Sequence, residues 1–203
     1  MAHDNPIHLL THEHHYILKV VHGLSAIDQD LEAGRRPDIA RLHGVVAFMR
    51  EFADRCHHAK EEAILFPAME DKGVPHDGCP IEGLLREHAR GRERVGALAA
   101  AINALERGDA AAPAALHEAI AGIQQLYPNH IWKEDQMVFP MAERLFSAAE
   151  LADLHARFEQ AEVELGPEHE RYAAFADEMA ALLGADAGTA TNAAGGHLHP
   201  PTH

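Results

Sequence analysis

HHAKEEAILFPAME, residues 57–70, is the stretch that decides the fold, because it recurs 73 residues further on as HIWKEDQMVFPMAE, residues 130–143. The two copies share six positions at that one offset, namely His57/His130, Lys60/Lys133, Glu61/Glu134, Phe66/Phe139, Pro67/Pro140 and Glu70/Glu143. A glutamate followed by a histidine precedes each copy, at 13–14 and again at 87–88. The chain therefore repeats one helical pair, in which the second helix carries His-x-x-x-Glu.

The chain has the residue pattern of helices throughout. Sustained polar/apolar alternation is missing, β-branched clusters are few, and Ala, Leu, Glu and Arg are abundant. The turn-forming segments EAGRRPD, DKGVPHDGCP and GDAAAP divide it into long helices, predicted at residues 6–32, 38–71, 81–107 and 113–145. Because short connections favour antiparallel neighbours, the sequence predicts an all-α protein with an up-down antiparallel four-helix bundle over residues 1–145.

Two further segments follow the predicted bundle. Residues 146–184 indicate a helical extension that bends at LGPEHE and packs on the bundle or on a partner subunit, which would give a dimer. Residues 185–203 are rich in small and polar residues and offer little to bury. We expect this tail to be disordered.

Charge and composition argue against several classes of partner. With 17 Lys and Arg against 32 Asp and Glu, the formal net charge is −15, which disfavours nucleic acid and anionic membranes. The sequence has no apolar run of about 18 residues, and its start, MAHDNPIHLL, lacks the pattern of a signal peptide. We expect a cytoplasmic protein in which Cys56 and Cys79 are free thiols.

The repeated residues have the spacing of a metal site. In an α-helix, residues i and i+4 lie on one face, so His57 with Glu61 presents an imidazole and a carboxylate in one direction. His130 and Glu134 do the same in the second copy. With one marked histidine from each of the other two helices, four imidazoles and two carboxylates meet inside the bundle. Burying them without partners costs several kcal/mol per charge, a cost that bound metal offsets.

The internal symmetry of the repeat predicts two metals. Each takes two histidines, and Glu61 and Glu134 are free to bridge the pair. A nitrogen-rich set without thiolate suits iron, zinc or copper better than magnesium or calcium, and bridging carboxylates favour iron. Four protein bonds per iron leave positions for an oxo or hydroxo bridge and for a small incoming molecule, which points to a diatomic or a peroxide as the partner.

These motifs resemble the hemerythrin family, the HHE cation-binding domain, whose members bind a non-haem di-iron centre in a four-helix bundle. The resemblance covers residues 6–145, and FADRCHHAKEEAILFP with HIWKEDQMVFP is similar to bacterial members. It implies nitrogen ligands and bridging carboxylates at the matching positions, which are His14, His57, His88, His130, Glu61 and Glu134.

The number of histidines separates branches of this family. The oxygen-carrying hemerythrins of marine invertebrates use five, with three on one iron and two on the other. Four at the matching places is closer to the di-iron proteins linked to nitrosative stress and iron–sulfur repair. Two histidines of the last helical segment, His155 and His169, are the candidates for a fifth ligand.

One ambiguity concerns the register of the first motif. His58 and Glu62 have the same spacing as His57 and Glu61. In the second copy the positions that match 58 and 62 hold isoleucine and aspartate, so only one register recurs. We therefore choose His57 and Glu61.

The resemblance leaves the activity open. Binding or sensing of O2 or NO at a His4Glu2 centre is the first expectation. The alternatives are a di-iron enzyme that acts on peroxide, O2 or NO with an outside electron donor, an iron storage or donor protein, and a structural zinc site. Tyr127, Glu13 and Glu87 are candidates to hydrogen-bond a metal-binding histidine or a bound molecule.

Overall fold

The computed structural model describes residues 5–165 and 169–192, in which helices are joined by short turns and no strand occurs. The all-α prediction is confirmed. In the η elements the helix is widened to π geometry, with hydrogen bonds between residues i and i+5. The elements in chain order are α1 (Pro6–Glu32), α2 (Ile39–Phe48), η1 (Met49–His58), η2 (Glu61–Leu65), α3 (Phe66–Asp71), α4 (Ile81–Glu106), α5 (Ala112–Lys133), η3 (Glu134–Val138), α6 (Phe139–Leu145), α7 (Ala148–Leu165) and α8 (His169–Asn192).

The ends of α1 show how local chemistry sets the helix limits. Asn5 precedes the helix in extended conformation, and its side chain accepts a hydrogen bond from the Ile7 N–H at 2.9 Å. At the other end Gly34 has a φ of 70°, a conformation that glycine adopts at little cost. The Arg35 N–H then reaches back to the Asp30 carbonyl at 2.8 Å, which closes the helix.

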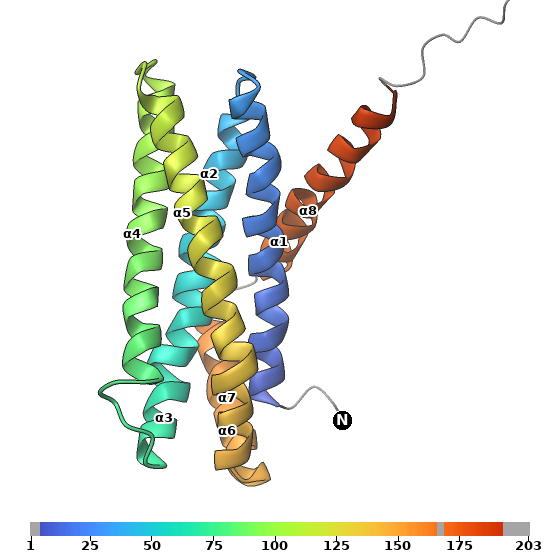
Figure 1. Ribbon diagram of the computed structural model, residues 1–203. Helices are drawn as coiled ribbons and strands as arrows, with labels where there is room; N and C mark the ends of the chain where they lie inside the picture. Colours follow the sequence, from blue (N-terminus) through green and yellow to red (C-terminus); the bar gives the residue numbers. More distant parts are fainter. Residues whose placement is uncertain (1–4, 166–168, 193–203) are drawn as a thin grey trace, which may run out of the picture.

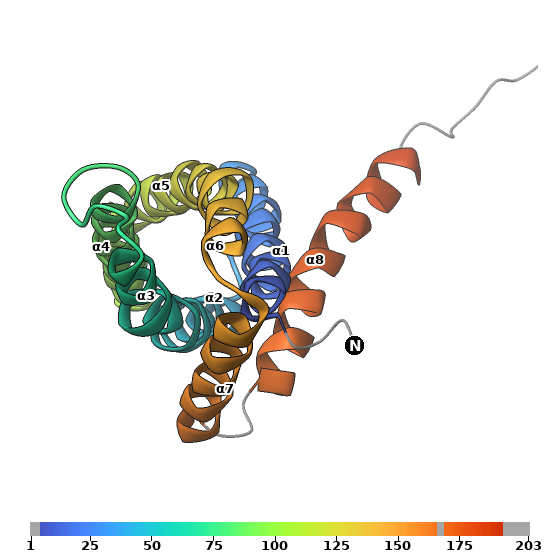
Figure 2. The same cartoon turned by 90° about the horizontal axis from the view of Figure 1, so that it is seen from below.

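The long helical runs lie side by side around a common centre (Figures 1 and 2). These runs are α1, α4, the stretch from α2 to α3 and the stretch from α5 to α6. α5 packs along both α4 and α1. The turn at residues 72–80, between α3 and α4, is largely exposed. Among the residues described, no helix combines the length and apolarity that a membrane span requires.

The core consists of two apolar clusters at different heights along the bundle. One includes Leu24, Phe48, Leu98 and Ile120. The other includes Leu10, Phe66, Leu84 and Phe139. At roughly 1.5–3 kcal/mol for each large apolar side chain removed from water, both clusters stabilise the fold. Each long run passes from one cluster to the other, and the buried polar residues lie between them.

The C-terminal extension forms two helices, α7 and α8, outside the ring of long helices (Figure 2). α8 packs closely on α1, where a Cβ at Gly23 would come within 2.6 Å of the Met179 carbonyl oxygen. Contrary to the predicted tail at 185–203, α8 continues to Asn192. Several alanines and the lack of proline in this stretch favour helix. Residues 193–203 lie outside the part that the structure describes.

Candidate metal centre

Buried polar side chains gather in the layer between the two apolar clusters. They come from α1, α4, α5, η3 and the continuous helical run from η1 through η2, and almost all are histidines or glutamates. Their exposed fractions are 3% or less, although ionisable groups are rarely buried so fully without partners. They are Glu13, His14, His57, His58, Lys60, Glu61, His88, His130 and Glu134.

The π-helical elements allow consecutive residues to serve this layer. A π turn holds more residues than an α turn, so neighbours in sequence point in more similar directions. His57 and His58 both end η1 and are 1% and 2% exposed. The proline after each motif is compatible with the widening, because it has no N–H for the i−4 bond. Three such pairs border the centre, namely His57/His58, Glu61/Glu62 and Glu134/Asp135.

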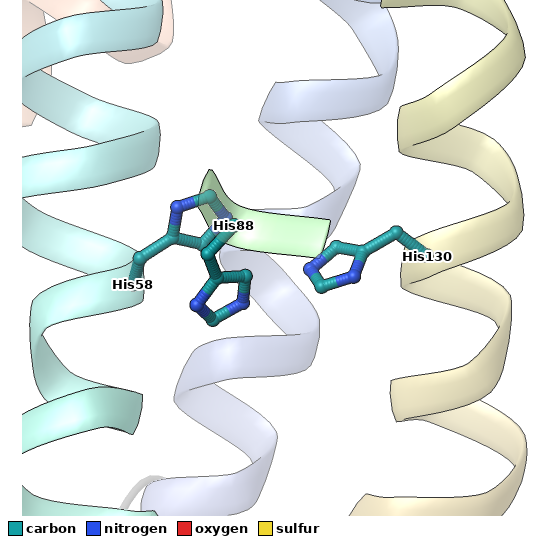
Figure 3. A group of neighbouring side chains, drawn as sticks. All are labelled: His58, His88 and His130. Atoms are coloured by element: carbon teal, nitrogen blue, oxygen red, sulfur yellow. The ribbon is translucent and has the colours of Figure 1, made fainter. Parts of the chain in front are cut away.

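Two groups of potential ligands face each other across the layer. Within each group, one ligand atom per residue lies within 4.8 Å of all the others. Figure 3 shows one group, three histidines that converge from η1, α4 and α5. The three-histidine group is His58, His88 and His130, and the mixed group is His14, His57, Glu61 and Glu134.

The two carboxylates lie between the groups. The Glu134 oxygens point in opposite senses, Oε2 at 3.2 Å from His14 Nε2 and Oε1 at 3.2 Å from His130 Nε2. Glu61 Oε2 lies 3.7 Å from His57 Nε2 and 3.5 Å from His88 Nε2. Each carboxylate therefore contacts both groups, which is the placement that bridging requires.

Most of the atoms that face the centre lack hydrogen-bond partners, whereas His14 Nε2 and His57 Nε2 lie 3.0 Å from each other. Both oxygens of Glu61, both oxygens of Glu134, and Nε2 of His88 and of His130 are buried without one in the described structure. Buried polar atoms are normally paired, so a cluster of unpaired acceptors needs an explanation. Cations at the two groups would satisfy these atoms, and imidazole with carboxylate is a donor set that suits iron.

A carboxylate holds the outer nitrogen of each histidine in the two groups. Because a carboxylate accepts, each Nδ1 carries the proton and donates, which leaves the Nε2 lone pair directed inward. The predicted roles of Glu13 and Glu87 as hydrogen-bond partners agree with this geometry. The five Nδ1 contacts are His57 to Glu13 (2.9 Å), His130 to Glu87 (3.0 Å), His14 to Asp135 (2.8 Å), His88 to Glu62 (2.7 Å) and His58 to Asp54 (3.3 Å).

Cationic side chains donate hydrogen bonds to most of these carboxylates. Lys60 donates to Glu13, and Lys133 donates to Glu87. Lys60 is 1% exposed and also donates to Glu162 of α7 at 2.7 Å. The α7 helix is thereby tied to the hydrogen-bond chain that ends at His57.

Burial disfavours the charged form of the ionisable side chains in this layer, and neighbouring groups decide which of these side chains stay charged. Burial lowers the pKa of His14, but the nearby Asp135 and Glu134 carboxylates outweigh it and raise that pKa to about 9. Burial and the adjacent Glu134 carboxylate raise the pKa of Glu61 well above its usual value. Burial lowers the pKa of His57 to about 4. Without a cation, protons on His14 and Glu61 partly offset the crowding of carboxylates.

The centre follows the internal repeat except on one side. Glu13, His57 and Lys60 correspond to Glu87, His130 and Lys133, and the pair His14/Asp135 corresponds to His88/Glu62. Three residues on the side of His58 do not follow the internal repeat. His58, Asp54 and Arg92 correspond by position to Ile131, Tyr127 and Leu18.

The structure brings together all six predicted ligands and adds His58. The prediction kept the His57/Glu61 register alone, whereas the π geometry of η1 turns His57 and His58 inward together. The sequence held a signal for this. The acidic pair at 61–62 recurs as Glu134/Asp135, and each pair supplies one central carboxylate and one that supports a histidine.

The other candidates lie outside the two groups. His155 belongs to α7 and is in neither group; its Nε2 lies 3.6 Å from Glu159 of the same helix. The side chain of His169 falls outside the described part. Tyr127 is 3% exposed, and its ring stacks on that of His58 with centroids 6.5 Å apart. Cys56 and Cys79 are free thiols, as predicted.

Comparison with known proteins shows which family this chain matches. Residues 5–142 match the family model described as the hemerythrin HHE cation binding domain. The chain is 30% identical over 133 residues to the uncharacterized proteins Rv1995 of Mycobacterium tuberculosis and Mb2018 of Mycobacterium bovis. The alignment covers 65% of this chain and 51% of each relative, so the chain spans about half the length of these relatives. No solved structure gives a significant match.

Proposed function

The chain belongs to the hemerythrin HHE cation-binding domain family, and from that premise we propose that it is a non-haem di-iron protein that binds or senses a small diatomic molecule, O2 or NO. The observation that carries the proposal is the set of buried carboxylate oxygens and imidazole nitrogens that face one another without hydrogen-bond partners in the described structure. Two cations between them would remove the cost of leaving these atoms unpaired.

The residues divide naturally between two metals. His58, His88 and His130 would hold one, His14 and His57 the other, and Glu61 and Glu134 would serve both. When bound, iron supplies vacant coordination positions and one-electron chemistry, which imidazole and carboxylate do not have. The unequal histidine count makes the two positions chemically different.

The chain itself would orient its ligands and keep water away. Carboxylates fix each ring through Nδ1, so the inward nitrogens need little reorganisation when a cation binds. The apolar clusters on either side limit access of bulk water to the layer. The antiparallel up-down order of four helices is part of the same proposal, supported by the side-by-side runs in Figure 1.

The first test is metal content followed by an optical spectrum. We expect close to two irons per chain after anaerobic loading with ferrous iron. The spectrum is then recorded before O2, after O2 and again after O2 is removed. A visible band that appears with O2 and disappears on its removal supports reversible binding, and the same series with NO tests the second ligand.

Other outcomes assign the protein to a different class. Sustained consumption of peroxide, O2 or NO beyond the amount of protein, with an added electron donor, would indicate an enzyme. Many more than two irons per chain would indicate storage. A colourless protein that keeps zinc in preference to iron would contradict the proposal.

A further inference from the structure

A cavity of about 150 Å³ lies beside the three-histidine group, between η1, α4 and α5. Its volume is several times the roughly 30 Å³ that one water molecule takes up in the liquid. The polar residues that line it are Arg50, Asp54, His58, Arg92 and Tyr127. His58 thus presents one side of its ring to the cavity while it belongs to the group that faces the centre.

Tyr127 brings an unused hydrogen-bond donor to this cavity. The residue is 3% exposed, and its hydroxyl makes no hydrogen bond to any residue in the described ranges. Asp54 and Arg92, both cavity residues, are the charged groups that act on this hydroxyl. Gly91 makes the position possible, because a Cβ there would lie 2.9 Å from the hydroxyl oxygen. Burial raises the pKa of Tyr127, so the hydroxyl keeps its proton and can donate.

The charges of the cavity residues leave a positive excess. Arg92 is occupied, with hydrogen bonds of 2.8 Å to Asp54 and 2.8 Å to Glu62. Asp54 also accepts from His58, and Glu62 lies toward His88 rather than in the cavity lining. Arg50 is exposed and forms no ion pair with any residue that the structure describes. Asp54 and Glu62 thus compensate Arg92, and Arg50 is the cavity cation that no described carboxylate pairs.

The opposite side of the internal repeat lacks such a cavity lining. The positions that match Arg50, His58 and Arg92 hold Ile123, Ile131 and Leu18. Ile123 and Ile131 are buried in the apolar cluster. The helical framework is therefore stable with apolar residues at these places. The polar lining on one side alone indicates a ligand rather than a packing requirement.

We propose that this cavity binds a small monoanion of the size of azide or nitrite, held by the Arg50 guanidinium and the Tyr127 hydroxyl beside His58. The proposal deepens the proposed function by adding a ligand class next to the metal centre. An anion there also competes with Asp54 for Arg92, and Asp54 is the group that orients His58. Anion binding in the cavity is thereby coupled to the position of a metal-binding ring.

The test is an azide titration of the full-length chain, with and without metal, followed through the side-chain Nε–H signals of Arg50 and Arg92 in nitrogen-15 NMR. We expect saturable shifts of both signals in the metal-free chain. Tyr127→Phe and Arg50→Met should each weaken binding about tenfold, the usual effect of losing a hydrogen bond to a charged group. Gly91→Ala, which displaces the hydroxyl, should weaken it too.

Matched controls separate this site from general effects. Tyr16→Phe removes a hydroxyl that is bonded to His12 instead, and Arg41→Met removes an arginine that pairs with Asp38. Both should bind azide like the unmodified chain. Equal affinity in cavity and control variants would overturn the anion site. If the chain takes up no iron, the proposed function fails on its own, because the metal-free titration still reports on the cavity.

Discussion

His58 and His155 allow a direct test of which histidine completes the centre. His58→Ala should weaken the binding of one of two irons, because it removes one of three converging imidazoles. His155→Ala is the matched control, since its ring lies in neither group. Iron content by elemental analysis after dialysis distinguishes them. A His155→Ala protein that loses iron while His58→Ala keeps both would reverse the assignment.

The central carboxylates make a stronger prediction at the same scale. Glu134→Ala should lower the iron content to one or none per chain, because each Glu134 oxygen faces a different histidine group. Glu61→Ala should lower the iron content in the same way. Glu118→Ala, at an exposed position outside the centre, is the control. Two irons retained in both central variants would show that these carboxylates do not bridge.

The protons that the centre would hold before metal binds predict how metal binding depends on pH. The pKa of His14 is raised to about 9, so at pH 7 the metal-free ring is largely protonated. Burial and Glu134 likewise favour the protonated form of Glu61. Metal must displace these protons, so its apparent affinity should rise from pH 6 to pH 9, about tenfold per pH unit for each proton displaced. Competition with a chromophoric chelator measures this, and a flat profile over that range would refute it.

The sequence predicted six residues of the centre because they recur at fixed offsets. It left out His58 because the position that matches His58 in the second copy holds isoleucine, so only the His57/Glu61 register recurs. The π geometry that brings both histidines inward is a property of the assembled helix. Lys60 was similarly noted only as part of the repeat, although it is buried and pairs with Glu13.

At the scale of elements, α7 is joined to the centre through Lys60. Lys60→Met should lower the free energy of unfolding by about 3–5 kcal/mol, because it leaves the buried Glu13 without its cationic partner. Lys133→Met changes the matching residue of the repeat, whose side chain is 42% exposed, and should cost at most about 1 kcal/mol. Thermal and urea unfolding measure both. Equal losses would mean that the burial of the Lys60–Glu13 pair does not add to stability.

The helix limits could be predicted where turn chemistry marks them. α1 has the predicted limits of Pro6 and Glu32, since an asparagine cap and a glycine with positive φ act within a few residues. The predicted end of α8 was too early, because the Gly184–Asn192 stretch is rich in small and polar residues with little to bury, although its alanines favour helix. The sequence left open whether the extension packs on the bundle or on a partner subunit, because that choice depends on contacts between residues far apart in sequence, such as Lys60 and Glu162.

At the scale of the whole molecule, the centre follows the internal repeat. The residues that depart from the repeat lie beside the cavity. Most residues around the two groups exist in matching pairs. The exceptions, His58 with Asp54 and Arg92, meet at the three-histidine group. A symmetric framework with one polar side makes the two groups of potential ligands unequal without any change of fold.

The exposed turn at residues 72–80 separates the chain into two pieces that each hold an incomplete set of ligands. The mixed group needs Glu134 from the second piece, and the three-histidine group needs His58 from the first. Cutting the chain in this turn should therefore give fragments that take up iron only when recombined. In such a two-piece protein the bound metal would hold the two pieces together, and a chelator would separate them during gel filtration. Recombined pieces that stay together equally well after chelation would show that apolar packing alone joins them.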